Sequence, residues 1–467
     1  MPYMIFTVFI SLCFSGFLSA DTESHEIEIL TLQNIQQKAG GIWLSDGYGY
    51  LIQSADVVTV YNITPTVCLQ LSQDQDSPLN YVDRFEVDEN ATSMDIFSSF
   101  EPYRVTLNKI PQLPEHCKKS PSYNAIDVFD AFSSFYAQHY AFFEIHGVDW
   151  HKETTQIKKQ LEVNTPDSSL IEPVIGLLSR LKDGHVGISG EIDGEEGEFI
   201  AYPGSTLQAV QEEFKGEGSA MAAFGKQFLR EDIEKNILLG QGKNAVNERI
   251  KYGLTQNNIG YMAIMSVGGF SDKESDYAAE AEALRMALDN ILSYFNQNKV
   301  KAVIIDLSVN RGGYDYLGRQ IAERFTKKTV HAYSKYAADA KSKRPQKLSL
   351  NASKQFVFTG PVYVLTSDIT VSAAEILTIS LRALPNVTHV GSKTRGAFSD
   401  VLTKYLPNGW ELSMSNEVYL DHEGINWEGR GVTPEVEFEV FNVNNPFSGH
   451  MPAIRKTIAL INQHLDE

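Results

Sequence analysis

The stretch Gly360 to Glu375, GPVYVLTSDITVSAAE, places an apolar strand, a short turn and the start of a helix in direct succession. The run PVYVLT has the β-branched content and length of a buried strand, and AAEILTISLRAL after Ser372 repeats apolar residues at helical spacing. Ser372 therefore stands at a helix start, where unpaired N–H groups and the positive end of the dipole stabilise an anion. This position suits a nucleophilic serine, but Ser372 with Glu375 is equally the pattern of a plain capping box.

A second strand, turn and helix are predicted about 60 residues earlier, in KAVIIDLSVNRGGYDYLGRQIAERF from Lys301 onwards. Two such units predict parallel strands with crossover helices, whose carboxyl ends share one crevice. Gly312 and Gly313 allow backbone N–H groups to approach a substrate, although a Gly-Gly pair also serves as a simple tight turn. Because no Gly-Lys-Ser/Thr follows, a nucleotide site is not expected.

Five blocks of sequence follow one another around these two units: NIGYMAI (258–264), VIIDLSVNRGG (303–313), VYVLTSDITVSAAEI (362–376), GSKTRG (391–396) and EGRGVTPEVE (428–437). In their order and spacing they resemble the core of the C-terminal processing, or tail-specific, serine proteases, the family that includes the tricorn core. The resemblance covers roughly residues 120 to 440. It implies an α/β fold with a ClpP/crotonase-like core of parallel strands and crossover helices.

The resemblance also implies roles for the residues of the two strand-turn-helix units. Ser372 corresponds to the nucleophile, and the amide of Ala373 pairs with one glycine of the Gly312-Gly313 pair as the oxyanion hole. The tail-specific branch activates its serine with a lysine in the block that resembles GSKTRGAFS. This chain has Ala397 at that position, and Lys393 stands elsewhere in the block, so a Ser-Lys dyad is not expected.

The tricorn-like branch instead uses a histidine ahead of the core and an acidic residue shortly before the Gly-Val-x-Pro element. His185, in LLSRLKDGHVGI, and Glu428, in NWEGRGVTPE, fill these positions, with Glu423 as a rival acid. An imidazole titrates near neutrality and can accept the serine proton and return it to the leaving amine, while a carboxylate orients the ring. The tricorn type has a second serine beside its histidine, where this chain has Gly184, so Ser189 or a water is the candidate fourth member.

These residues predict a serine endopeptidase that cleaves peptides or proteins through an acyl-enzyme. No metal-ligand cluster or cofactor loop is recognisable, so no cofactor is expected. Two alternatives stay open. The same core occurs in interphotoreceptor retinoid-binding proteins, so the chain could bind an apolar ligand or peptide without cleaving it. An esterase or amidase would use the same acyl chemistry.

The domain organisation is predicted from composition and periodicity along the 467 residues. Tail-specific relatives carry a PDZ domain, but residues 190–242 lack its carboxylate-binding loop and strand pattern, so no PDZ domain is expected here. The expected segments are a signal peptide at 1–20, an N-terminal β-rich domain at 21–118, a helical subdomain carrying His185 at 119–255 and the α/β protease core at 256–467.

The first 20 residues are uncharged and end in Leu-Ser-Ala, which favours a secretory signal and a secreted or periplasmic protein, with no membrane span once the signal is removed. Cys68 and Cys117 then remain as an even pair and are expected to form a disulfide in an oxidising compartment, the alternative being two buried thiols. The net charge of −19 argues against binding nucleic acid or anionic membranes. A local basic stretch between two strands, from Lys327 to Lys347, is expected to be a solvated loop.

Overall fold

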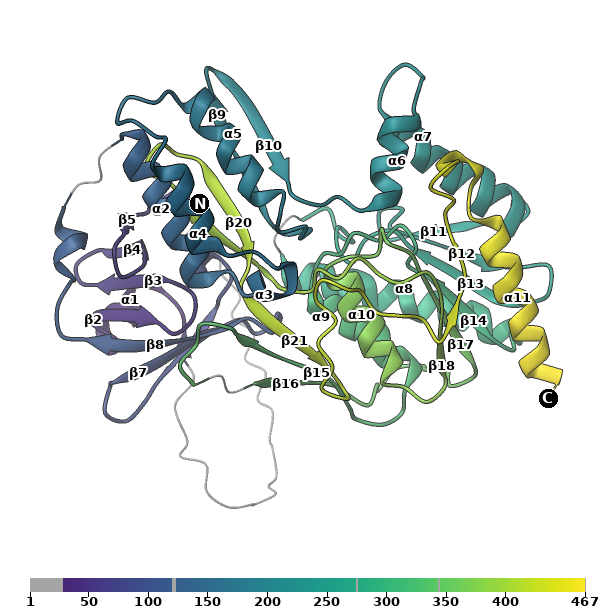
Figure 1. Ribbon diagram of the computed structural model, residues 1–467. Coiled ribbons are helices and arrows are strands. Elements are labelled where there is room, and N and C mark those ends of the chain that lie inside the picture. The colour runs from purple at the N-terminus through teal and green to yellow at the C-terminus, as the bar shows by residue number, and fades with distance from the viewer. Residues whose placement is uncertain (1–27, 120–122, 274–275, 343–344, 467) are drawn as a thin grey trace, which may run out of the picture.

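The structure is a computed structural model that describes residues 28–119, 123–273, 276–342 and 345–466. The expected signal peptide at 1–20 lies outside these residues. Figure 1 shows an antiparallel sheet of the N-terminal part beside a larger α/β part, with later strands running between them. No helix in the described ranges has the length and apolar character needed to cross a membrane.

The α/β part is built on a seven-stranded sheet. Five of its strands, β13, β14, β17, β18 and β22, are parallel. β11 and β12 extend the sheet in antiparallel orientation. Its strands, in spatial order, are β11 (Lys243–Ala245), β12 (Ile250–Leu254), β13 (Gly260–Ile264), β14 (Val303–Asp306), β17 (Val362–Thr366), β18 (Val387–Gly391) and β22 (Val436–Glu437). The predicted core of parallel strands with crossover helices is confirmed.

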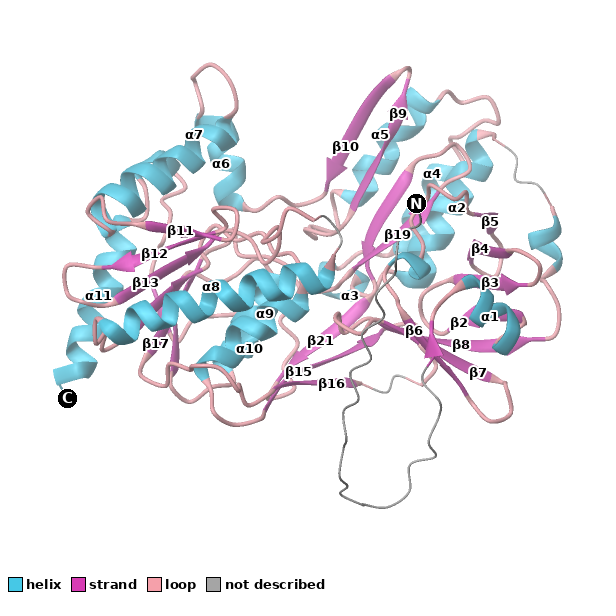
Figure 2. Cartoon of the chain, turned by 180° about the vertical axis from the view of Figure 1, so that it is seen from behind, coloured by secondary structure: helices cyan, strands magenta, loops and turns pink. Residues whose placement is uncertain are grey.

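Helices cover both faces of this sheet, because alternate residues of each buried strand point to opposite sides. Met262 and Ile264 pack with one helical layer, and Tyr261 and Ala263 pack with the other. Figure 2 shows the first layer in front of the sheet. That layer contains α8 (Tyr277–Gln297), α9 (Asp315–Ala322) and α10 (Ala373–Arg382), and the second contains α6 (Ser205–Glu213), α7 (Ala220–Lys226), a π-helix (Gln227–Ile237) and α11 (Met451–Asp466).

The N-terminal part is an eight-stranded antiparallel sheet. Cys68 in β5 is joined to Cys117 by a disulfide. The helix α1 (Leu32–Lys38), capped by the Thr31 side chain, was not predicted. The strands, in spatial order, are β1 (Glu28–Ile29), β6 (Arg84–Val87), β7 (Ser93–Phe97), β8 (Arg104–Ile110), β2 (Gly41–Ser45), β3 (Tyr50–Ser54), β4 (Val58–Ile63) and β5 (Cys68–Gln70).

A helical layer lies between the N-terminal sheet and a third, four-stranded sheet. The aromatic face of α2, including Phe132 and Tyr136, is buried. It belongs to one continuous hydrophobic core with Trp43 of the N-terminal sheet and Trp410, so the two parts pack as one body here. The elements are α2 (Ala125–His139), α3 (Phe143–His146), α4 (Trp150–Lys158) and α5 (Asp167–Leu178), and the sheet order is β10 (Glu195–Ile200), β9 (Gly187–Ile192), β20 (Glu411–Ser415), β19 (Val401–Tyr405).

Asn408-Gly409 forms the turn of a hairpin, since β19 and β20 pair across it and Gly409 has a φ of 90°. Residues 190–242 looked weakly patterned, but they begin with the second half of the β9–β10 hairpin and continue into helices. The sequence of β10 shows no alternation of apolar and polar residues, because most of its side chains are exposed.

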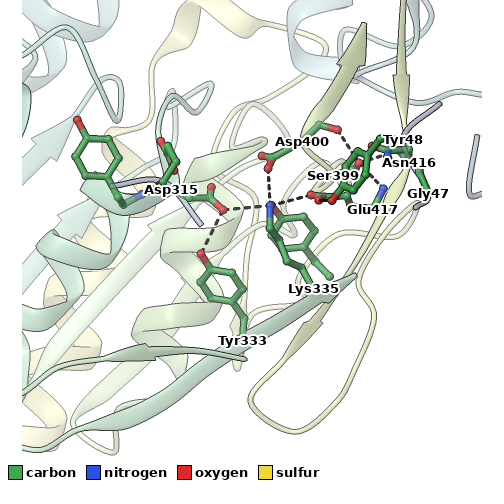
Figure 3. A network of polar contacts seen from close by, with 12 residues as sticks. Gly47, Tyr48, Asp315, Tyr333, Lys335, Ser399, Asp400, Asn416 and Glu417 are labelled. Carbon is green, nitrogen blue, oxygen red and sulfur yellow. Dashed lines mark hydrogen bonds and ion pairs between the residues drawn. The ribbon is translucent and has the colours of Figure 1, made fainter. Parts of the chain in front are cut away.

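The fourth sheet has the order β16 (Gln346–Leu350), β15 (Val330–Ala337), β21 (Glu417–Asp421). It corrects the reading of the basic stretch as a solvated loop. Lys335 lies in β15 and is buried, with its ammonium 2.6 Å from Asp400 and 2.9 Å from Glu417 (Figure 3). Among its described residues, the stretch therefore contains one buried cation, Lys335, beside exposed ones such as Lys347.

Candidate active site

Ser372 lies at the junction of the turn after β17 with helix α10. Its backbone has φ 62° and ψ −134°, a conformation that a residue with a Cβ rarely adopts and that costs about 1–3 kcal/mol. The strain is held by the Ser372 N–H, which donates to the Ala397 carbonyl at 3.0 Å. The side chain is half-buried and stands at the start of the helix, as the sequence predicted.

Glu375 fixes the neighbouring chain against this helix start. Its Oε2 accepts from Ser372 N at 3.3 Å and from Ala397 N at 2.9 Å, and its Oε1 accepts from Gly396 N at 2.7 Å. Burial raises the pKa of Glu375 to about 7, against the opposing effect of these donors. The capping glutamate thus holds residues 396–397 beside the serine, so the capping box and the candidate nucleophile coexist.

The glycine pair lies directly against the serine. A Cβ added to Gly312 would stand 2.7 Å from the Ser372 Cβ and 3.0 Å from the Ala373 N, and Gly312 has a φ of 97°. Only glycine allows the loop to approach this closely. The Gly312 N–H donates to Asn310 Oδ1 at 2.9 Å. The N–H of Gly313 is therefore the better candidate of the pair for a substrate oxygen.

His185 lies in the turn between α5 and β9. Asp183 Oδ1 accepts the His185 backbone N–H at 2.8 Å, which fixes the turn. A Cβ added to Gly184 would stand 3.4 Å from the Ala397 Cβ and 3.2 Å from the Arg395 Cδ. The turn therefore packs against the residue whose carbonyl accepts the Ser372 N–H. A serine at 184 would crowd Arg395, which is a physical reason for the glycine.

The environment of His185 favours its neutral form. Burial lowers the pKa of His185 below its ordinary value of 6.5, Asp183 and Asp400 oppose this shift, and Arg395 adds to it. A neutral imidazole at pH 7 is the form that can accept a proton. The Nδ1 atom of His185 is buried and has no hydrogen-bond partner among the described residues.

Glu428 is buried and contacts the segment that follows Ala397. Its Oε2 accepts the Phe398 N–H at 2.9 Å, and its Oε1 is buried with no hydrogen-bond partner in the described part of the chain. Burial raises the pKa of Glu428 well above its ordinary value, and Asp183 adds to this effect. The rival Glu423 is exposed, as is Lys393.

The structure therefore brings the predicted residues together to different degrees. Ser372, Ala373 and the glycine pair are in contact, while His185 and Glu428 approach them through residues 397–398. Within the described ranges, no hydrogen bond joins the serine, imidazole and carboxylate side chains. Sequence reasoning missed the positioning roles of Asp183 and Asn310, although an Asp two residues before a Gly-containing turn is an Asx-turn signal that could have indicated the former.

The parallel sheet, the strained serine at a helix start and the glycine loop beside it define an α/β protein of the serine hydrolase class. Comparison with known proteins agrees with this class: residues 258–438 match the family model of peptidase family S41. The chain contains a region similar to that family and is a serine-type peptidase. The predicted resemblance to C-terminal processing proteases is thereby confirmed.

Relatives of known name are similar to most of the chain. The carboxy-terminal processing protease CtpA of Bacillus subtilis (strain 168) is 22% identical over 325 residues, which are 62% of this chain and 68% of that protein. A putative peptidase from Parabacteroides merdae ATCC 43184 superposes with a TM-score of 0.57 at 24% identity, over 73% of this chain and 97% of its own. Mature CPAF superposes with a TM-score of 0.51 at 12% identity, over 73% of this chain and 97% of the CPAF chain. At these identities, the two structures establish the fold alone.

Proposed function

We propose that this protein is a serine endopeptidase in which Ser372 is the nucleophile, His185 the general base and then acid, and Glu428 the residue that orients the imidazole. The observation that carries the proposal is the packing around Ser372. Gly312 lies against the Ser372 Cβ. The turn that carries His185 lies against Ala397, whose carbonyl accepts the Ser372 N–H. This packing supports a site in which a nucleophile, backbone donors and a base act on one substrate carbonyl.

In the proposed reaction, Ser372 Oγ forms a bond to the scissile carbonyl carbon while His185 Nε2 takes the hydroxyl proton. The oxyanion accepts hydrogen bonds from the Ala373 and Gly313 amides, each worth about 3 kcal/mol in comparable enzymes. The C–N bond then breaks, and His185 gives its proton to the leaving amine. A water molecule, activated by the same imidazole, hydrolyses the acyl-enzyme and restores Ser372.

Two unsatisfied atoms support the role of Glu428. The Nδ1 of His185 and the Oε1 of Glu428 are both buried without a partner in the part of the chain that the structure describes, which costs about 1–3 kcal/mol for each atom. In the proposed complex these two atoms pair with each other, which would recover this cost. Catalytic hydrogen bonds are commonly longer in the free enzyme than in the complex.

The proposed compartment is the secretory or periplasmic space. The Cys68–Cys117 disulfide supports it, because such bonds persist in oxidising surroundings and are rare in the cytosol. The uncharged first 20 residues, read as a signal peptide, are consistent with the same compartment.

A fluorophosphonate probe tests the proposal, since it reacts only with an activated serine. We expect a single covalent adduct, located by mass spectrometry on the peptide that contains Ser372, and cleavage of unstructured polypeptides that the probe abolishes. A chain that binds peptides but forms no adduct would be a non-catalytic binding protein, a candidate kept open by the separated side chains of the triad. Hydrolysis of esters without hydrolysis of peptides would indicate an esterase.

The pH dependence of kcat/KM provides a test of His185. Because burial lowers the pKa of His185 and the neutral imidazole is the base, we expect activity to rise with pH and to reach half its plateau below pH 6.5. His185→Gln should remove the activity. His146→Gln is the matched control, because His146 also lies near Asp183 with a lowered pKa, and it should keep the wild-type profile. A midpoint at about 7 would point to Glu375 as the titrating group.

A further inference from the structure

A cavity of about 180 Å³ lies between the N-terminal sheet and the protease core, next to the glycine loop. Glu101, from the loop between β7 and β8, lines one side, and Asp315 and Asp400 of the core line the other. The rings of Tyr81, Tyr103 and Tyr277 form part of the wall. A water needs only about 10–15 Å³ by this kind of measure, so the cavity has room for one long side chain.

The cavity begins at the candidate oxyanion hole, because Gly313 is one of its lining residues. Gly313 follows Gly312, which packs on Ser372. When a carbonyl oxygen of a peptide binds the Gly313 N–H, the side chain of the same residue is the nearest substrate group to this opening. The cavity is thus placed to receive the residue that supplies the scissile carbonyl.

The polar groups of the cavity are short of positive charge. The Oε1 of Glu101 is buried and has no hydrogen-bond partner among the described residues, while its Oε2 accepts the Tyr316 N–H at 3.3 Å. The carboxyl groups of Glu101, Asp315, Asp400 and the adjacent Glu417 interact with two cations, Lys335 and Arg319.

The two cations are engaged on the protein side to different degrees. Lys335 is committed to Asp400 and Glu417, at 2.6 and 2.9 Å. The Arg319 Nη2 donates to the Phe100 carbonyl at 3.4 Å, while its Nε is buried and has no hydrogen-bond partner among the described residues. Figure 3 shows Lys335 between Asp400 and Glu417, with Asp315 on the opposite side of the network. A further cation would therefore have an unused carboxylate oxygen to bind, that of Glu101.

The acid strengths of the two facing carboxyls agree with this geometry. Burial, with the charges of Asp315 and Asp400, raises the pKa of Glu101 well above its ordinary value. Burial and Asp400 raise the pKa of Asp315 to about 7. Negative charge in the empty cavity is therefore costly, and an entering cation would reduce that cost.

We propose that this cavity is the specificity pocket of the enzyme and that it selects substrates with lysine or arginine at the residue that supplies the scissile carbonyl. The inference rests on the proposed function of Ser372. Glu101 provides the unpaired carboxylate for the cationic head, and the tyrosine rings cover its methylene stem and attract its charge. The N-terminal sheet then has a role in catalysis, since it supplies one wall of the substrate site.

Phosphonate probes test the pocket without a known substrate. Two dipeptidyl diphenyl phosphonates, one with a lysine and one with a norleucine side chain at the reacting residue, are compared by their second-order rates of labelling Ser372. We expect the lysine probe to react about tenfold faster or more, since its ammonium would make a charge-assisted contact with Glu101 that norleucine cannot make. Glu101→Gln should reduce this preference to about twofold or less, and Glu101→Asp should retain much of it.

The controls separate the pocket from a structural role of Glu101. Glu89→Gln, at an exposed turn of the same sheet, should leave the preference unchanged. If Glu101 only docks the sheet on α9 through Tyr316, both probes and a small fluorophosphonate would slow equally in Glu101→Gln. That result, or a wild-type preference for norleucine, would overturn the inference while leaving the peptidase assignment intact. Failure of the wild type to react with any of the three reagents would instead refute the proposed function, and with it this pocket.

Discussion

Replacing Ser372 with alanine is expected to reduce peptide turnover by a factor on the order of 10⁴ to 10⁶, as the loss of a nucleophile does in other serine proteases. Alanine keeps the Cβ and the positive φ of 62°, so only the Oγ is lost and the strained turn should be retained. The measurement is kcat on an unstructured polypeptide, together with loss of the fluorophosphonate adduct. The midpoint of urea unfolding should fall only by the loss of the cap hydroxyl, about 1 kcal/mol, which leaves the protein folded under assay conditions.

Ser380→Ala is the matched control for this experiment. Ser380 lies on the same helix, α10, is fully buried, and its Oγ has no hydrogen-bond partner among the described residues. The substitution removes the same atom from the same helix, but two turns away from the substrate, so turnover should be unchanged. Equal activity of Ser372→Ala and Ser380→Ala would contradict the assignment of the nucleophile.

The parts of the site that were predictable are those encoded locally. A buried strand, a turn and an amphipathic helix leave a pattern within about 20 residues, and two such units predicted the parallel sheet and the position of Ser372. The approach of Gly312 to the serine follows from the same topology, because adjacent parallel strands β14 and β17 end at one edge of the sheet. His185 and Glu428 were named only through the family resemblance, since their own surroundings carry no catalytic pattern.

The parts that were not predictable depend on partners far apart in the sequence. Glu101 meets Asp315 and Asp400 only because the N-terminal sheet packs on the core, and no local pattern encodes that packing. Lys335 was assigned to a solvated loop because its neighbours in sequence are basic. Its partners Asp400 and Glu417 lie 65 and 82 residues away. The basic composition of the stretch therefore predicted the exposure of its other described lysines correctly, but it predicted the wrong environment for Lys335, which is buried.

Replacing Lys335 with methionine is expected to destabilise the protein by about 3–5 kcal/mol, the range found when one member of a buried ion pair is removed. Lys335 and Glu417 are 2% and 1% exposed, so the variant leaves a carboxylate buried without its cation. Burial already raises the pKa of Glu417 in the wild type, and loss of Lys335 would raise it further. The urea unfolding midpoint measures the effect.

The pH dependence of this loss separates a charge effect from a packing effect. A carboxyl whose pKa is raised in the folded state costs stability as pH rises above its unfolded value, so the deficit of Lys335→Met should be larger at pH 8 than at pH 5. Glu417→Gln in the same chain should recover part of the loss, because the unpaired charge is then absent. Lys347→Met, an exposed change in the same basic stretch, should alter stability by less than about 0.5 kcal/mol. A pH-independent deficit that Glu417→Gln does not relieve would mean that Lys335 acts through the packing of its methylene stem and not through its charge.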